Sequence, residues 1–542
     1  MKAFSWLNRF QHRRGIRWAR VILHRGVAPD SSRKPWTLIV GLAGILVWQF
    51  VFSAVVLFGA GTLDTRYRNT ASVGVIHEGK FAYFLAYKGL FPVATTLPEP
   101  PPGRAGADWV IRNHPETLVQ DLTYTWLSGD YGKVIPHLYD AWLKGVPLNT
   151  TMIPFNRMLF TVSLWSLFAS FWYLRRPFMG SVMVVLLGSN PFQLLHVHAH
   201  DNVIGLPITT AILILALHLP WLTATHPRAR YTWALPIVTG VLLASIRTIR
   251  SEPAPIILAA LGTYLTLCGW PWRRRLALAA LLIVACIGTG SAWRLFFLKK
   301  HAEARAFLAS VGGNPLPGTP RLYHHFWHPV WCGLGDFDTK HGYKWSDKVA
   351  LAYAKPILEK QYGIKVPIYD VEGKYGPEEY FDARRVYKRL PFHIDEYDIV
   401  ARNKVLHDIA SDPVWYAGIL AKRAWRVVNE LTPVRIAFGT MHRHLPMHGL
   451  VALALLLACV VSRQWFLSKL IVFTMPTLVT AMIVYSGDGV TYYGIYHIVA
   501  AGILASLVFG IIRHFVRQRR GRRSAGTAEI RAVSEHHSSA NV

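Results

Sequence analysis

Apolar runs of transmembrane length recur along the chain and dominate its hydrophobic pattern. A helix needs about 17–25 mostly apolar residues to cross the hydrocarbon of a bilayer. Runs close to or above that length cover residues 38–60, 156–174, 178–197, 203–222, 232–249, 254–271, 276–295, 447–462, 469–485 and 490–512. The run at 447–462 is the shortest of them. The pattern predicts an all-α, multi-span membrane protein with about ten transmembrane helices.

The short loops between these runs carry a charge pattern that predicts the topology. Four of them, in alternate positions, are basic and contain no acidic residue: they hold Arg175 and Arg176, Arg228 and Arg230, Arg273 to Arg275, and Arg463 with Lys469. Lysine and arginine accumulate in short loops on the cytoplasmic side. Both chain ends are basic too, so both are expected in the cytoplasm. The long loops 61–155 and 296–446 are then extracytoplasmic, and the expected location is the inner (plasma) membrane of a bacterium.

This topology divides the chain into five parts. Residues 1–36 are expected to form a basic amphipathic arm on the cytoplasmic leaflet, and residues 37–295 an N-terminal transmembrane module that includes the outer loop 61–155. Residues 296–446 are a large extracytoplasmic region, 447–512 the last transmembrane helices, and 513–542 a basic cytoplasmic tail with a composition typical of disorder. The chain has a net charge of +29, and its basic residues are concentrated at the two chain ends. Basic ends of this kind are expected to bind anionic membrane lipids rather than nucleic acid.

The end of the large outer region has the pattern of an amphipathic helix at 413–431. Its apolar positions are Trp415, Ile419, Trp425 and Val428, and its basic positions are Lys422, Arg423 and Arg426. A helix of this kind lies at a membrane interface with its basic side toward the headgroups. We therefore expect this helix next to the membrane, ahead of the following span.

Ionisable residues at the outer ends of the spans are the first candidates for a functional site. Asp201 and Glu252 are the only carboxylates between residues 142 and 302, and charged groups so close to hydrocarbon usually mark function. Arg247 and Arg250 lie three residues apart at the outer end of the run 232–249. They share one helix face, so together they could bind a phosphate group. Alternatively, they pair with Glu252 or extend to lipid headgroups.

Three segments resemble the GT-C superfamily of membrane glycosyltransferases. GVLLASIRTIRSEPAPIILAAL (240–261) is similar to a helix rich in small residues that ends in a basic residue followed by proline. DLTYTWLSGDY (121–131) is similar to an Asp-x-x-Tyr helix followed by a Gly-Asp turn, and HDIASDPVWY (407–416) is similar to a motif ahead of a basic helix. The resemblance implies a GT-C-like fold and transfer of a sugar from a polyprenyl-phosphate carrier on the extracytoplasmic face.

The resemblance also implies roles for individual residues. A carboxylate in the first outer loop would accept the proton of the acceptor hydroxyl, and Arg247 with Arg250 would hold the leaving phosphate. Asp121 is the first choice for this base because it begins the matching helix. Tyr124, one turn later, is expected to contact the sugar or the acceptor. Asp64, directly after the first span, is the alternative, and each of these aspartates could equally be an ordinary solvated loop residue.

Histidines cluster in three places on the expected outer side. The clusters are His196, His198 and His200; His324, His325 and His328; and His442, His444 and His448. His196 and His200 share a helix face with the spacing of metal ligands, but no cluster completes a structural zinc signature. No metal ligand is therefore assigned, and a divalent metal stays an alternative. We expect His200, Asp201 and Glu252 to contact the sugar instead.

The outer segment YHHFWHPVWCGLGDFD (323–338) combines aromatic, histidine and acidic residues. Aromatic rings with nearby carboxylates suit a sugar-binding surface. His328, Trp331 and Asp336 are therefore assigned to the side that binds the acceptor. A packed lid over the membrane domain explains the same residues almost as well.

Together these features favour an inverting glycosyltransferase with a polyprenyl-phosphate-linked sugar as donor and a glycan, lipid or protein as acceptor. A ligase or polymerase that moves a whole saccharide from polyprenyl diphosphate would have a similar topology. A lipid or saccharide flippase is a third alternative. A transporter would distribute its charged residues along a path through the membrane, whereas here the acids and the outer arginines collect at one level.

Overall fold

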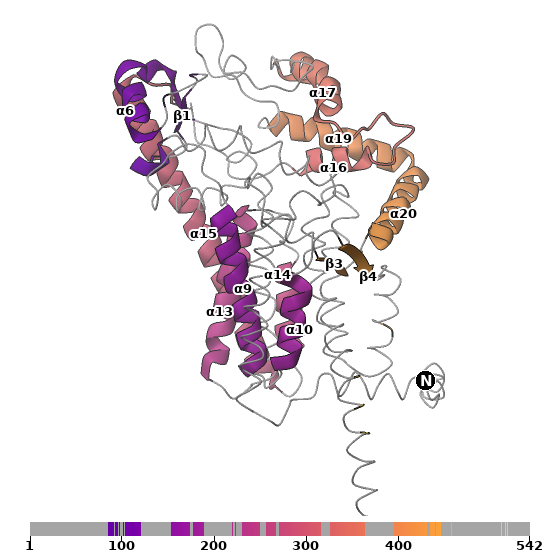
Figure 1. The fold of residues 1–542 in the computed structure, drawn as a ribbon. Helices are drawn as coiled ribbons and strands as arrows, with labels where there is room; N and C mark the ends of the chain where they lie inside the picture. Colours follow the sequence, from indigo (N-terminus) through magenta and orange to yellow (C-terminus); the bar gives the residue numbers. More distant parts are fainter. Residues whose placement is uncertain are drawn as a thin grey trace, which may run out of the picture.

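The computed structural model describes residues 85–90, 93–95, 97, 101, 103–120, 153–173, 177–188, 219, 223, 230–249, 256–266, 270–315, 326–363, 395–430, 434–438, 441–445, 457, 511, 515 and 518. This part is mostly helical, in agreement with the predicted fold class (Figure 1). Two helical segments in it, Tyr231–Ile249 and Trp272–Val311, are long and apolar enough to span a membrane. The runs at 38–60, 203–222, 447–462, 469–485 and 490–512 lie outside the described residues except for isolated positions.

Five of the described helices begin within four residues of the start of a predicted apolar run, and the last of these five continues well past the end of its run. The longer described helices are α6 (Gly103–Asn113), α9 (Ile153–Tyr173), α10 (Pro177–Gly188), α13 (Ala234–Ile249), α14 (Ile256–Leu265), α15 (Trp272–Val311), α16 (Trp327–Leu334), α17 (Asp347–Tyr362), α19 (Asp395–Ser411) and α20 (Pro413–Glu430). Short 3-10 turns cover Ala86–Lys88, Pro115–Thr117 and Arg230–Trp233. Helices α9, α10, α13 and α14 and the first half of α15 form one bundle (Figure 1).

Two small antiparallel sheets are an addition that the all-α expectation omitted. Strand β1 (Val93–Thr95) pairs with β2 (Leu118–Gln120), and β3 (Val434–Phe438) pairs with β4 (Met441–Leu445). Each sheet has only two strands. The pairs join short segments outside the apolar runs, so hydropathy alone gave no signal for them.

Helices α13 and α15 pack side by side and run in the same direction. Arg274, at the start of α15, donates a hydrogen bond to Thr232 Oγ1 at 3.4 Å, just before α13 begins. Trp293 Nε1, further along α15, donates to Ser245 Oγ at 3.2 Å near the end of α13. Because the contacts advance together along both helices, the two helices are parallel, as the expected order of spans requires.

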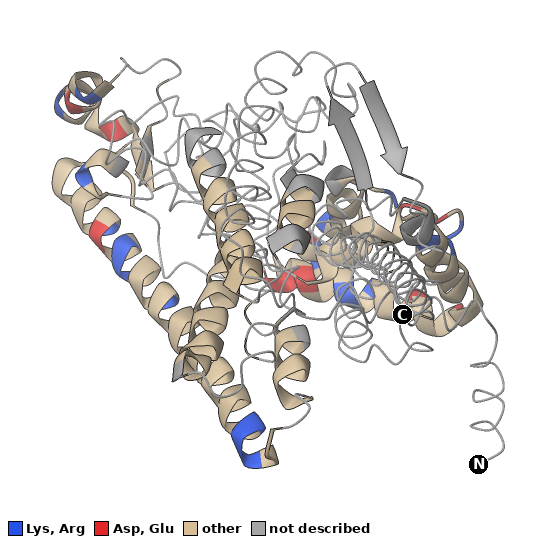
Figure 2. Cartoon of the chain, turned by 60° about the horizontal axis from the view of Figure 1, so that its bottom comes forward, with Lys and Arg blue, Asp and Glu red and all other residues tan. Residues whose placement is uncertain are grey.

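Arg230 and Arg273 to Arg275, the basic loop residues that the structure describes, lie at one end of this bundle. The Arg274 guanidinium stacks 4.1 Å from the Trp270 ring centroid and 5.2 Å from that of Trp233. The Tyr173 ring, at the end of α9, meets the Tyr231 ring edge-on at 5.7 Å. The ends of α9 and α15 that adjoin the basic loops are therefore level with the start of α13. Figure 2 shows the basic residues at this tip of α15.

Helix α15 is much longer than a bilayer is thick. Its 40 residues correspond to about 60 Å of helix, against about 30 Å of hydrocarbon. Its large exposed apolar side chains are Trp272, Leu276, Ile283, Val284, Ile287, Leu295 and Phe296. No large apolar side chain of α15 beyond Phe296 is similarly exposed in the described structure. The boundary expected at residue 295 therefore separates an apolar from a polar half of one continuous helix.

The polar half of α15 carries the described part of the first outer loop. Asn314 N donates to Leu118 O at 2.8 Å, and Gln120 N donates to Asn314 O at 3.1 Å. Asn314 Nδ2 also donates to Glu116 O at 2.6 Å. The apolar core of this contact consists of Leu85, Val93, Ala107, Val110, Leu118, Ala304 and Leu308. The two outer segments expected from the sequence are thus packed together.

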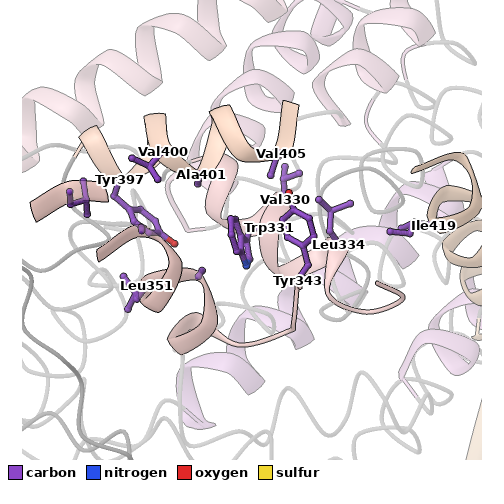
Figure 3. Close-up of a cluster of buried hydrophobic side chains, with 13 residues drawn as sticks. Val330, Trp331, Leu334, Tyr343, Leu351, Tyr397, Val400, Ala401, Val405 and Ile419 are labelled. Carbon is purple, nitrogen blue, oxygen red and sulfur yellow. The ribbon is translucent and has the colours of Figure 1, made fainter. Parts of the chain in front are cut away.

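The second outer segment forms its own helical core, shown in Figure 3. Helices α16, α17, α19 and α20 enclose Val330, Trp331, Leu334, Tyr343, Ala350, Leu351, Ala354, Leu358, Tyr397, Val400, Ala401, Val405 and Ile419. Asp412 caps α20, because its Oδ1 accepts a hydrogen bond from Trp415 N at 3.0 Å. Pro413 follows as the first helical residue, where its missing N–H costs nothing.

Helix α20 matches its predicted range, but its two faces differ from those expected. Arg423, assigned to the basic face, is fully buried, whereas Trp425, assigned to the apolar face, is 60% exposed. Trp415, Ile419 and Arg423 follow each other at intervals of four residues, so they share one face. Trp415 and Ile419 on that face pack on the outer core; Arg423 on the same face is buried, whereas Trp425 is outside.

We predict that Gly240→Ala destabilises the helix bundle. An added Cβ would lie 2.7 Å from both the Leu282 carbonyl oxygen and the Ala285 Cβ, and such overpacking costs about 1–3 kcal/mol. Gly288→Ala in α15 is the matched control, since nothing lies within 4 Å of its added Cβ. Thermal unfolding in detergent should show a lower Tm for Gly240→Ala and an unchanged or higher Tm for the control. Equal Tm values would contradict the close packing of α13 on α15.

Candidate functional site

Most of the predicted site residues lie outside the described residues. These are Asp64, Asp121, Tyr124, His200, Asp201, Arg250 and Glu252. The structure describes Arg247 in the membrane bundle, and His328, Trp331 and Asp336 in the outer region. It brings the last three together in and just after α16.

Arg247 lies in the last turn of α13 and is exposed. The hydrogen bond between Ser245 and Trp293 places this turn level with residue 293 of α15. The exposed apolar stripe of α15 ends only three residues further on, at Phe296. Arg247 therefore lies near the boundary between apolar and polar surface, at the end of α13 remote from the basic loops. A guanidinium at such a boundary can bind a phosphate group through two parallel N–H···O hydrogen bonds.

The strand that leads into the Asp121 motif is fixed to α15. The Gln120 side-chain amide nitrogen lies 2.8 Å from His301 Nδ1 and donates to the His301 carbonyl oxygen at 3.1 Å. Both residues are buried, at 2% exposure each. The chain thus enters residues 121–131 from a fixed point on the same helix that packs beside Arg247.

Trp331 is a core residue of the outer region. It is 1% exposed, and its ring meets that of Tyr343 edge-on at 4.6 Å. A sugar cannot stack on a ring enclosed in this way, and Trp331 packs within the core of the outer region in this structure. His328 is half-buried, with its Nδ1 2.6 Å from the Tyr397 hydroxyl. Asp336 follows α16 directly and is also half-buried.

The strongest polar arrangement in the described outer region surrounds a carboxylate that the sequence did not single out. Asp338 accepts hydrogen bonds from the backbone N–H groups of Lys340, His341 and Tyr343, the last at 2.7 Å. It also accepts one from Trp415 Nε1 at 2.9 Å. Partial burial alone raises the pKa of Asp338, but the donated hydrogen bonds outweigh it and leave the pKa below its usual value. The carboxylate thereby fixes the loop 335–346 to the start of α20.

Asp408 joins the same loop to α19. It accepts hydrogen bonds from the Tyr343 hydroxyl and from Lys404 Nζ, both at 2.7 Å. The Lys404 ammonium also lies 4.9 Å from the Tyr343 ring centroid and 5.7 Å from that of Trp331, within cation–π range. Burial and the bond to Asp408 raise the pKa of Tyr343, so its hydroxyl stays protonated and donates. Such a network makes the loop rigid rather than reactive.

Sequence analysis found part of this cluster and missed the rest. Asp408 and Asp412 lie in the segment 407–416, but His341 and Tyr343 come from a loop more than 60 residues earlier in the chain. The one signal in the sequence for a tight loop there is the glycine of DTKHG (338–342). In the structure this glycine adopts a φ of 82°. Pairing across such a separation depends on how α16, α17 and α19 pack.

Within the described residues, no group of three or more His, Cys, Asp or Glu side chains could hold a metal ion. The histidines at 196, 198, 200, 324, 325 and 448 lie outside those residues. His442 and His444 are on β4, opposite Ala437 and Arg435 of β3. A divalent metal therefore stays an alternative.

No protein-family model matches this chain, and no curated protein or solved structure matches it either. The resemblance to the GT-C superfamily rests on its motifs and expected topology.

We predict that Asp338→Asn destabilises the outer region at neutral pH. The amide would direct an N–H toward a backbone donor, and a lost hydrogen bond to a charged group costs about 1.5–3 kcal/mol. The folded-state pKa of Asp338 is lowered, so its contribution is present above the unfolded value of about 3.9 and is lost as the pH falls through the folded value. Thermal unfolding of the wild type should therefore show a decline in Tm below about pH 4 that the variant shows less strongly.

Glu359→Gln is the control for Asp338→Asn, because Glu359 is 41% exposed and pairs only weakly with Lys355 at 3.8 Å. Its Tm should follow the wild-type curve at every pH. A variant Asp338→Asn with wild-type stability at pH 7 would show that the carboxylate does not fix this loop.

Proposed function

We propose that this chain is an integral-membrane glycosyltransferase of the bacterial inner membrane, with a GT-C-like fold of about ten spans. It would transfer a sugar from a polyprenyl-phosphate carrier to a glycan, lipid or protein acceptor on the extracytoplasmic face. Both chain termini would be cytoplasmic. The motifs at 121–131, 240–261 and 407–416 and the alternating loop charge support this proposal.

The observation that carries the proposal is the division of α15 into two halves. Its apolar half packs beside α13, whose last turn carries Arg247, and its polar half binds the segment that leads into Asp121. The basic residues Arg273 to Arg275 are at the opposite end of the same helix. This arrangement suits a reaction between a phosphate held at the membrane surface and an acceptor held just outside it.

The proposed chemistry needs only these few groups. Asp121, or Asp64 in its place, accepts the proton of the acceptor hydroxyl as that oxygen bonds to the anomeric carbon. The bond between this carbon and the phosphate oxygen breaks on the opposite face, and the electron pair leaves with the polyprenyl phosphate. Arg247 and Arg250 balance the charge on that leaving phosphate. Attack from the opposite face inverts the anomeric configuration.

We predict that cells without this protein accumulate one polyprenyl-phosphate sugar, because its consumption would stop. Mass spectrometry of lipid extracts from deletion and complemented cells checks this. Accumulation of a polyprenyl-diphosphate saccharide would favour the ligase or polymerase alternative. An unchanged lipid profile would contradict any transferase that uses such a donor.

We also predict that Arg247→Ala and Asp121→Asn abolish or strongly reduce transfer from that lipid. A lost charge-assisted contact of about 1.5–3 kcal/mol corresponds to roughly a tenfold to hundredfold loss, and removal of a general base costs about 10²–10⁴-fold. Lys299→Ala is the control, since Lys299 is 76% exposed on the outer half of α15. Turnover is measured with purified variants and the accumulated lipid.

The remaining outcomes separate the alternatives. An inactive Asp64→Asn beside an active Asp121→Asn would move the base to Asp64 and leave the function unchanged. If Asp64→Asn, Asp121→Asn and Asp201→Asn all keep wild-type turnover, the single-carboxylate mechanism is wrong. The flippase alternative would then be preferred.

A further inference from the structure

His341 lies between two carboxylates at the point where the loop 335–346 meets the junction of α19 and α20. Its Nδ1 is 3.8 Å from Asp408 Oδ1, and its Nε2 is 3.8 Å from Asp412 Oδ2. The side chain is only 18% exposed. Its ring also meets the Trp415 ring edge-on at 4.4 Å. The imidazole is thus held in place with one nitrogen toward each carboxylate.

A neutral imidazole cannot present an N–H donor to both carboxylates. It has one N–H donor and one acceptor nitrogen, so one of the two carboxylates faces a lone pair. His341 Nε2 is buried and has no hydrogen-bond partner among the described residues. A proton on the ring would give each nitrogen an N–H directed at a carboxylate. Only a ring that carries a proton on both nitrogens can therefore present an N–H to each of the two carboxylates.

The other charges around His341 leave a deficit of one positive charge. Asp412 pairs with Lys340, and Asp408 pairs with Lys404 at 2.7 Å and accepts a bond from Tyr343. Asp338 has no lysine partner in the described structure and is bonded by backbone N–H groups and by the indole of Trp415. The charged and titratable groups in this network are thus Asp338, Lys340, Tyr343, Lys404, Asp408 and Asp412. Asp336 and Lys344, of opposite charge, lie on the same loop, and His407 and Tyr416 lie on α19 and α20. Two lysines face three aspartates, and protonated His341 makes the cluster neutral.

We propose that His341 is a pH-sensitive latch that holds the loop 335–346 more firmly to the α19–α20 junction when the surroundings become acidic. The latch does not depend on the proposed enzymatic function. In Figure 1, α20 leads from this junction toward the β3–β4 hairpin. The latch therefore controls how firmly the start of α20 is fixed to α16, α17 and α19. In the expected topology this region faces the external medium, whose pH it would sense.

Hydrogen exchange on the full-length protein in detergent tests the latch. Histidines ordinarily titrate between pH 5 and 8, so exchange is compared at pH 7.5 and 5.5 after correction for the intrinsic rate. Protection of the backbone N–H groups of Lys340, His341 and Tyr343 should rise by about threefold to tenfold on acidification, the effect of two charge pairs that are largely buried but not in direct contact. No change in the wild type would overturn the proposal.

Two histidine variants assign the effect. His341→Gln should lose the rise in protection, whereas His407→Gln, an exposed histidine on α19 beside Asp408, should keep it. A rise that persists in His341→Gln, or disappears only in His407→Gln, would exclude His341 as the sensor.

Asp412→Asn decides the matter if His341→Gln does not fold. Asparagine caps a helix as well as aspartate, so the bond to Trp415 N is kept while one charge facing His341 is removed. The hydrogen bond from Lys340 lowers the pKa of Asp412, so this carboxylate stays ionised from pH 7.5 to 5.5. Its pairing with Lys340 is then constant over the range, and the variant should show a distinctly smaller rise. An undiminished rise would contradict the latch.

Discussion

The packing of α15 against α13 on one side and against the first outer loop on the other is the interaction on which the described structure depends. Gly240 allows the two helices to approach closely enough for an added Cβ to meet a backbone carbonyl. Beyond Phe296 the same helix supplies Ala304 and Leu308 to the core that holds β2. A continuous helix bends little over this length, so a shift at one end is carried to the other. The helix bundle and the core that holds β2 therefore cannot be positioned independently.

The outer helices are held together by polar interactions as well as by an apolar core. Their core is apolar, but the loop 335–346 is attached to it through carboxylates: Asp338, Asp408 and Asp412 bind backbone N–H groups, lysines and a tyrosine hydroxyl. Hydrogen bonds to charged groups are directional and costly to leave unmade. Such a network selects one loop position, and the proposed latch at His341 acts on that position.

These two features together suit the proposed glycosyl transfer. A lipid-linked donor is confined to the membrane surface, whereas its acceptor approaches from the aqueous side. An enzyme for such substrates must hold both at a set distance. Helix α15 provides a rigid link between the level of Arg247 and the strand before Asp121. The outer helices form a second unit, and in our proposal the pH changes how tightly the loop 335–346 is attached to it.

For the described residues, the sequence alone determined the helical class, where the apolar helices begin and the helix at 413–430, because hydropathy and capping residues such as Asp412 and Pro413 act locally. It also predicted that α13 and α15 run in the same direction, through the charges of their loops. Only the tertiary structure decided that the helix begun at Trp272 continues past the apolar run to Val311 and that Trp331 and Arg423 are buried. The grouping of His341 with Asp408 and Asp412 likewise appeared only there. Such facts depend on which surfaces meet across long separations in the chain, and periodicity along the sequence does not record them.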